Sequence, residues 1–180
     1  MLSKRVSKHA AGVTLIELMI AIVILGILIT MGLPSFSTWI QNARTRSETE
    51  SLLRGLQLAR QEAISHNANV QLVLNGRDWS VNCETVSATC PTGMHARTTS
   101  GTSPVTLTES TGAGVYRFGS DGRLTQPDPN AGASFTSIDV TSNTLTGSDA
   151  RNLRVTITIG GAARVCDPAV TDAADLRVCP

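Results

Sequence analysis

A long apolar run near the N-terminus dominates the hydropathy pattern. The 21 residues from Val13 to Leu33 include one charged side chain, Glu17. As a helix this run would be about 31 Å long, close to the thickness of the bilayer hydrocarbon region. Basic residues precede it, which predicts a cytoplasmic N-terminus and a remainder in the periplasm or outside the cell. The run is too long for the apolar core of a secretory signal peptide, which is usually about 7–15 residues.

A second helical pattern follows Pro34. Apolar residues at steps of four, three and four mark one helix face: Leu52, Leu56, Ala59 and Ala63. We expect one long helix from Val13 to near Asn67, with a kink or local melting at Pro34, because proline lacks an amide proton. Charges of both signs fall between these positions and predict a solvated face without a function: Arg44, Arg46, Glu48, Glu50, Arg54, Arg60 and Glu62.

Short strands and turns replace the helical pattern from residue 68 onward. Val70–Leu74 and Trp79–Val81 flank Asn75-Gly76, a pair typical of a type I′ hairpin turn. The other strand candidates are short and rich in threonine and valine: Val105–Thr108, Val115–Phe118, Phe135–Val140, Leu153–Ile159 and Ala163–Cys166. We expect loops at 98–103 and 126–132. The pattern predicts an α+β fold, with an antiparallel sheet packed on the second half of the long helix.

Charge and composition exclude several functions. The chain has 180 residues and a formal net charge of +1, which argues against a bulk polyanion binder. Both lysines, Lys4 and Lys8, lie in the first twelve residues, and the rest of the chain has 12 arginines against 14 acids. A Walker-type phosphate lysine and a Schiff-base lysine are therefore excluded. The sequence has no nucleophile elbow or zinc-protease motif, and its glycines miss the dinucleotide-binding spacing. We expect a non-enzymatic protein without a cofactor.

Four cysteines lie beyond the apolar run, in an oxidising compartment: Cys83, Cys90, Cys166 and Cys179. They permit three pairings, of which we favour Cys83–Cys90 and Cys166–Cys179, because each closes a short local loop. A metal site of Cys83, Cys90 and His95 is the alternative, but it needs a fourth ligand and reduced thiols. We therefore predict no metal and expect His66 and His95 on the surface or in turns.

Glu17 is unusual, because an acid within a membrane helix costs on the order of 2–3 kcal/mol. One interpretation is a tolerated interfacial carboxylate, since Glu17 lies near the start of the run. In the other, cleavage after Gly12 creates an α-amino group at Val13 that pairs with Glu17 of the same or a neighbouring chain. The residues favour the second, because Gly12-Val13-Thr14-Leu15-Ile16-Glu17 resembles the class III signal of type IV prepilins and type II secretion pseudopilins.

This resemblance implies a processing step and the pilin fold. A prepilin peptidase would cut between Gly12 and Val13 and methylate the new N-terminus, and Glu17 would act in assembly. The implied organisation is a basic leader (1–12), a transmembrane and filament-core segment (13–33), the second half of the helix (34–67) and a β-rich periplasmic or extracellular domain (68–180). Major pilins usually carry phenylalanine where this chain has Val13, which favours a minor subunit near the filament tip.

The implied partners are other major and minor pilins or pseudopilins, prepilin peptidase, the inner-membrane assembly platform and, before assembly, membrane lipid. The implied function is to initiate or prime a type IV pilus or a type II secretion pseudopilus, and both machines use this leader. An uncleaved, membrane-anchored periplasmic domain is a further alternative.

Three later motifs resemble minor pilins of the FimT/FimU group and the pseudopilin GspH: Arg60–Ile64, Phe118–Arg123 and Arg164–Pro168. FimT relatives that bind DNA carry a Gly-Arg-x-Arg signature in a C-terminal loop, and Gly161-Ala162-Ala163-Arg164 lacks its first arginine. Four arginines remain as candidate DNA contacts: Arg151, Arg154, Arg164 and Arg177. Acidic residues are interleaved with them, which weakens a phosphate-binding surface. DNA binding in natural transformation is therefore the less favoured alternative.

Overall fold

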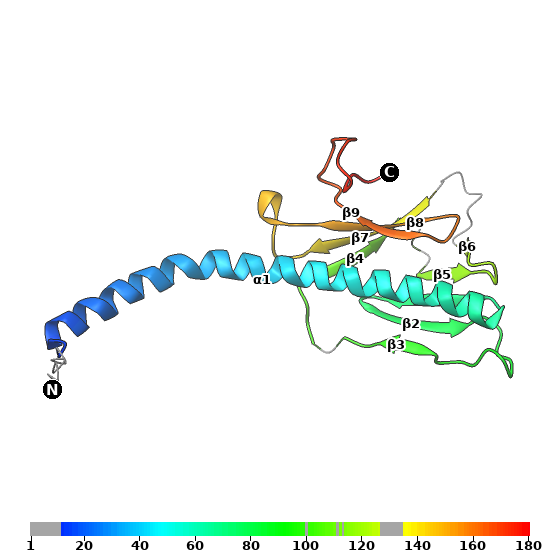
Figure 1. The fold of residues 1–180 in the computed structure, drawn as a ribbon, viewed down its shortest axis with the longest axis horizontal. Helices are drawn as coiled ribbons and strands as arrows, with labels where there is room; N and C mark the ends of the chain where they lie inside the picture. The colour runs from blue at the N-terminus through cyan, green and yellow to red at the C-terminus, as the bar shows by residue number, and fades with distance from the viewer. Residues whose placement is uncertain (1–11, 100, 111, 113, 127–134) are drawn as a thin grey trace, which may run out of the picture. The chain divides into compact units, whose positions relative to one another are not determined.

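The computed structural model describes residues 12–99, 101–110, 112, 114–126 and 135–180 (Figure 1). The chain divides into two compact units, Met1–Ser37 and Thr38–Pro180. Helix α1 (Leu15–His66) runs through both. Its backbone is helical through Pro34, so the local melting predicted there is absent. A kink at this position concerns the relative placement of the two units and stays a prediction.

Both ends of α1 are set by polar capping groups. The Glu17 amide donates to the Thr14 side-chain hydroxyl at 3.3 Å, the geometry of an N-cap threonine. The helix therefore begins at Leu15, two residues after the predicted start at Val13. At the other end Asn67 has a φ of +47°, and the Ala68 amide donates to the Ala63 carbonyl at 3.1 Å. This is a Schellman motif, which ends the helix within one residue of the predicted position.

Two antiparallel sheets pack around the second part of α1. The five-stranded sheet has the order β3-β2-β1-β5-β6, and the four-stranded sheet has the order β4-β7-β8-β9. The first contains β1 (Val70–Asn75), β2 (Asp78–Cys83), β3 (His95–Arg97), β5 (Val115–Phe118) and β6 (Leu124–Gln126). The second contains β4 (Val105–Glu109), β7 (Phe135–Ser142), β8 (Leu153–Thr158) and β9 (Ala163–Cys166), and a short 3₁₀ helix, η1 (Gly147–Asp149), precedes β8. Figure 1 shows α1 lying across strands of both sheets.

The predicted α+β fold is confirmed, and each predicted strand is present, but there are two sheets where one was expected. The strands β3 and β6 were not predicted, because three residues are too few to show alternation. In the first hairpin Asn75 pairs with Asp78, so the turn is Gly76-Arg77. Only Gly76 has a positive φ there, +62°, which is typical of a type II′ and not a type I′ turn. Of the second predicted loop, residues 127–132 lie outside the described part.

One hydrophobic core joins α1 to both sheets. The predicted apolar face of the helix is buried, with relative exposures of 0–1% at Leu52, Leu56, Ala59 and Ala63. Tyr116 and Phe118 of β5 are buried against it, as are Ile138 of β7 and Ile157 of β8. The unit Thr38–Pro180 therefore contains a core of its own, made from residues of one helix face and two sheets.

Candidate functional site

The predicted processing site lies immediately before α1. Gly12, Val13 and Thr14 are exposed and non-helical, and Glu17 is exposed in the first turn. Within the described residues no ion pair of Glu17 is recorded. The carboxylate thus lies at the helix N-terminus, where the helix dipole favours a negative charge. The Thr14-x-x-Glu17 spacing is a capping signal that the sequence carries beside the charge of Glu17, and it was not predicted.

The apolar segment of residues 13–33 exposes the large side chains that the structure describes there. Its valine, leucine, isoleucine and methionine side chains from Val13 to Leu33 are more than half exposed wherever they are described. Among the described residues no single helix is long and apolar enough to cross a membrane. Taken together, the two parts of α1, Leu15–Thr30 and Ser35–His66, are long and apolar enough to do so. An exposed apolar surface of this size is typical of a segment that contacts a membrane or another protein.

The cysteines form the two local disulfides favoured from the sequence. Cys83 is bonded to Cys90, with the Cα atoms 5.9 Å apart, and Cys166 is bonded to Cys179, with the Cα atoms 5.1 Å apart. The first closes the loop after β2, and the second closes the C-terminal loop after β9. The two cysteines of the alternative metal site are therefore joined in a disulfide and supply no thiolate.

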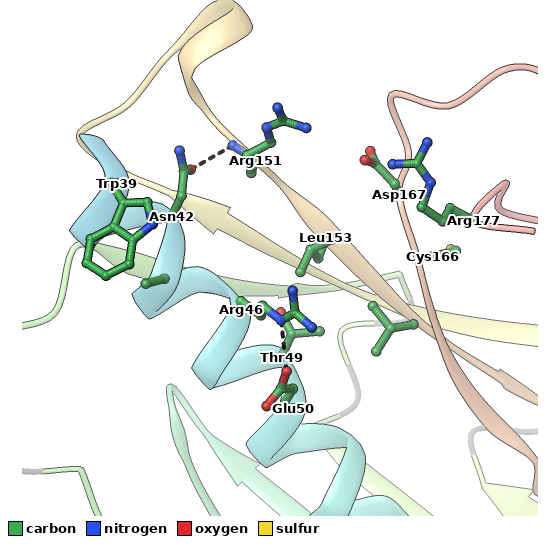
Figure 2. A pocket seen from close by; sticks show the side chains of 12 residues that line it. Trp39, Asn42, Arg46, Thr49, Glu50, Arg151, Leu153, Cys166, Asp167 and Arg177 are labelled. Carbon is green, nitrogen blue, oxygen red and sulfur yellow. Dashed lines mark hydrogen bonds and ion pairs between the residues drawn. The ribbon is translucent and has the colours of Figure 1, made fainter. Parts of the chain in front are cut away.

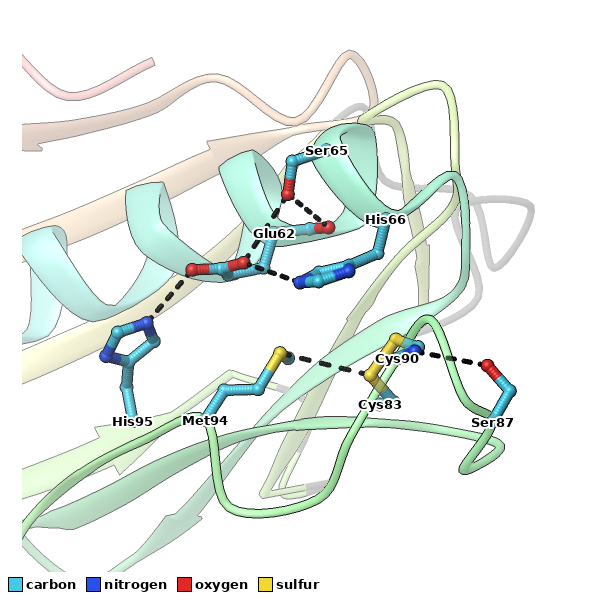
Figure 3. Close-up of polar contacts among 8 residues, drawn as sticks. All are labelled: Glu62, Ser65, His66, Cys83, Ser87, Cys90, Met94 and His95. Atoms are coloured by element: carbon cyan, nitrogen blue, oxygen red, sulfur yellow. Dashed lines mark hydrogen bonds and ion pairs between the residues drawn. A yellow bond between two sulfur atoms is a disulfide. The ribbon is translucent and has the colours of Figure 1, made fainter.

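His95, the third candidate ligand of that site, instead contacts α1. Its Nε2 lies 2.9 Å from Oε1 of Glu62, and Nε2 of His66 lies 3.2 Å from Oε2 of the same carboxylate (Figure 3). The Ser65 hydroxyl donates to the Glu62 backbone carbonyl at 3.2 Å. Glu62 was predicted to be solvated, but it joins the edge strand β3 to the helix.

Glu48 also departs from the predicted solvated face. Its side chain is 9% exposed and pairs with Arg97 at 2.6 Å and with Arg77 at 3.5 Å. Both arginines belong to the five-stranded sheet or its first turn, 29 and 49 residues away in the sequence. By contrast, Glu50 is 44% exposed and pairs with Arg46 and Arg54 along the helix. The prediction was therefore wrong for Glu48 and right for Glu50.

The candidate DNA-contact arginines are mostly engaged within the chain. Arg154 donates from Nε and Nη2 to Asp139 at 2.6 and 3.0 Å, which raises the pKa of the guanidinium. Arg177 donates to Asp175 at 3.1 and 2.7 Å, and these bonds lower the pKa of Asp175 to about 2. Arg164 donates to the Val178 carbonyl at 3.2 Å. Only Arg151 and Arg177 of the four line a common cavity.

That cavity is a groove of about 620 Å³ within the unit Thr38–Pro180, and Figure 2 shows its side chains. Helix α1 forms one wall, and β8, β9 and the C-terminal segment form the other. Asn42 holds the two walls together, because its Nδ2 donates to the Asp149 carbonyl and its Oδ1 accepts the Arg151 amide, both at 2.9 Å. Gln41 and Thr144 are also hydrogen-bonded across the same junction.

Two of the three later motifs meet at the other end of α1. Arg60 Nε donates to the Gly122 carbonyl at 3.1 Å, and a Cβ added to Gly122 would lie 2.7 Å from Ile64 Cδ1. Gly161, in the turn between β8 and β9, approaches even more closely, since a Cβ there would lie 2.0 Å from the Gly122 oxygen. The Leu124 amide donates to the Ile159 carbonyl at 3.0 Å, which joins the two sheets beside this contact. The glycine of the altered Gly-Arg-x-Arg loop thus has a packing role here.

Comparisons with known proteins agree with this architecture. Residues 7–33 match the prokaryotic N-terminal methylation motif, and residues 48–161 match the family described as type II transport protein GspH. Two crystal structures of the type IV minor pilin FimU of Pseudomonas aeruginosa have the same fold. One has a TM-score of 0.57 at 17% identity and covers 75% of this chain and 97% of FimU. The other has a TM-score of 0.53 at 18% identity and covers 71% and 97%. No curated protein sequence matches the chain.

The methylation motif and the exposed apolar helix define a membrane-anchored protein of the pilin and pseudopilin class, and its two-sheet domain has the fold of FimU. Within that class, the chain belongs to the GspH family, whose match spans more than half of its length.

Proposed function

We propose that this chain is a non-enzymatic minor pilin or pseudopilin that primes assembly of a type IV pilus or a type II secretion pseudopilus. The observation that carries the proposal is the exposed apolar surface of residues 13–33, which holds a single acid and is joined to a domain with its own core. A bilayer covers such a surface before assembly, and the corresponding helices of neighbouring subunits cover it afterwards. The domain is displayed in the periplasm and then at or near the filament tip.

Processing precedes assembly in this proposal. Prepilin peptidase cuts between Gly12 and Val13 and methylates Val13, which removes the basic leader and leaves an amine two residues before the helix. Intact-mass spectrometry of the chain expressed in membranes with its peptidase should show loss of residues 1–12 and one added methyl group. A full-length mass under those conditions would mean that the chain is an uncleaved membrane-anchored domain.

The amine of Val13 then pairs with Glu17 of an adjacent subunit in the low-dielectric filament core. Removing one member of such a buried pair costs about 3–5 kcal/mol, whereas an exposed pair contributes at most about 1 kcal/mol. Glu17→Gln should therefore leave insertion and cleavage intact but strongly reduce recovery in sheared filaments at matched expression. Glutamine still suits the capping position after Thr14, so this variant separates loss of charge from loss of the cap.

The results for two variants distinguish the roles of Glu17. Equal, low recovery of Glu17→Gln and Glu17→Ala supports pairing by charge. Normal recovery of Glu17→Gln with low recovery of Glu17→Ala would assign Glu17 to helix capping alone. Normal recovery of both would make Glu17 a tolerated interfacial acid and would refute the assembly role.

DNA uptake has weaker support. Arg154 and Arg177 are each paired with an aspartate, and Arg164 donates to a backbone carbonyl. A surface that neutralises phosphates needs several arginines that release counterions on binding, and these pairings reduce the number. We therefore propose filament priming as the function and retain DNA binding only as its alternative.

A further inference from the structure

The groove beside Trp39 combines an apolar floor with a rim of both charges. Ala43 of α1, Leu153 of β8 and Val165 of β9 contribute apolar side chains. Arg46, Arg151 and Arg177 contribute three positive charges, and Glu50 and Asp167 contribute two negative charges. In Figure 2 the Arg151 side chain extends toward the side of the groove that holds Asp167 and Arg177.

The charges of the rim do not suit a simple anion. Arg46 pairs with Glu50 at 2.9 Å, and Arg177 pairs with Asp175 at 2.7 Å. Among the described residues, no carboxylate pairs with the guanidinium of Arg151. A phosphate in the groove would meet the guanidinium of Arg151 but also the carboxylates of Glu50 and Asp167. A ligand that carries a phosphodiester and an ammonium group a few bonds apart complements both signs.

One residue of the groove lies close in sequence to the apolar segment. Trp39, which lines the groove, follows Leu33 by six residues, a span of at most about 21 Å even when fully extended. This limit holds for any orientation of the domain relative to the apolar segment. Trp39 is 65% exposed, and tryptophan favours the interface between bilayer and water because its side chain is both apolar and polar.

We propose that this groove binds the headgroup of a zwitterionic aminophospholipid of the bilayer surface while the subunit waits in the membrane. Arg151 donates to the phosphodiester, Asp167 accepts from the ammonium, and Trp39 packs against the glycerol region. The inference rests on the proposed function, because it requires a membrane-anchored stage. The contact would hold the domain against the bilayer and would be given up when the subunit enters the filament.

The test uses the full chain, labelled with 5-fluorotryptophan and purified in maltoside micelles, which contain no phosphate. Its two tryptophans give two ¹⁹F resonances, and Trp79, whose Nε1 donates to Ser51 at 3.3 Å, serves as the internal control. Titration with glycerophosphoethanolamine should shift the Trp39 resonance in a saturable way and leave the Trp79 resonance unchanged. Glycerophosphoglycerol, which has the phosphodiester without the ammonium, should bind about tenfold more weakly, the equivalent of one lost charge-assisted interaction.

Matched variants locate the effect. Arg151→Gln should weaken glycerophosphoethanolamine binding about tenfold, whereas Arg123→Gln removes an exposed charge outside the groove and should change nothing. Equal binding of the two glycerophosphodiesters, an equal response to inorganic phosphate, or an unchanged Arg151→Gln variant would each overturn the proposal. Failure here leaves cleavage and filament incorporation unaffected, and failure of those assays leaves the titration unaffected, so the two proposals fail separately.

Discussion

Replacing Gly161 with alanine should destabilise the domain by about 3 kcal/mol, because two penalties coincide at this position. Gly161 has a φ of +77°, and an L-residue in the left-handed region costs roughly 1–2 kcal/mol. The added Cβ would also lie 2.0 Å from the Gly122 carbonyl oxygen, whereas an ordinary carbon–oxygen contact is about 3.3–3.6 Å. The two turns must therefore separate by more than about 1 Å.

That separation carries a further cost. The Gly122 carbonyl also accepts the 3.1 Å hydrogen bond from Arg60, and overpacking of this kind typically costs about 1–3 kcal/mol. Gly147→Ala is the matched control, because Gly147 has a φ of +62° but nothing within 4 Å of its added Cβ. It should lose only about 1 kcal/mol.

Urea unfolding of the full chain in maltoside micelles, followed by tryptophan fluorescence, measures both free energies of unfolding. The expected difference between the two variants is about 2 kcal/mol, and it isolates the close approach of the turns. Equal losses within about 0.5 kcal/mol would show that Gly161 matters only for its backbone conformation, and the packing argument would be wrong.

Two further predictions concern buried polar groups of the domain. Glu48→Gln should cost about 3 kcal/mol in urea unfolding, because it leaves Arg97 and Arg77 beside an uncharged partner, whereas Glu50→Gln, at an exposed pair, should cost less than about 1 kcal/mol; equal costs would refute the distinction. Burial, together with the nearby Glu109 carboxylate, raises the pKa of Tyr116 far above its usual value. The folded state therefore keeps the phenol proton that the unfolded state releases, and above about pH 10 the free energy of unfolding should fall by up to about 1.4 kcal/mol per pH unit. Tyr116→Phe, measured from pH 8 to 11.5, should remove this fall, and an identical alkaline slope in both proteins would contradict it.

Local patterns made much of the fold predictable. The helix face of Leu52 and Leu56 and the strand β1 repeat at their own periods, so burial follows from spacing there. In β7 and β8 the alternation predicts the buried apolar positions but not the burial of Ser137 and Thr156. The division into two sheets was not predictable in this way, because strand order depends on pairings between distant segments. The burial of Glu48 depends on Arg97, 49 residues away, and the contact of Gly161 with Gly122 joins two turns that share no local signal.

In the candidate site, too, the features set by neighbouring residues were predictable and those set by distant contacts were not. The segment from Gly12 to Glu17 is continuous, so its motif is readable in the sequence, and the local disulfide pairing follows from short separations. The arginine patch was a spatial hypothesis made from a linear pattern. The structure pairs Arg154 with Asp139 across neighbouring strands, a contact that only the register of β7 and β8 determines.

Both disulfides close loops within the β-rich part, and neither links α1 to a sheet. When a pull is applied to α1, the domain therefore resists through noncovalent contacts. These are the buried face of the helix, the pairing of Glu48 with Arg97, and the bonds of Asn42 to the segment before β8. The force needed to detach α1 from the sheets therefore depends on how many of these contacts bear the load at the same time. Reduction of the cysteines should loosen two loops while the force needed to peel the helix from the sheets stays the same.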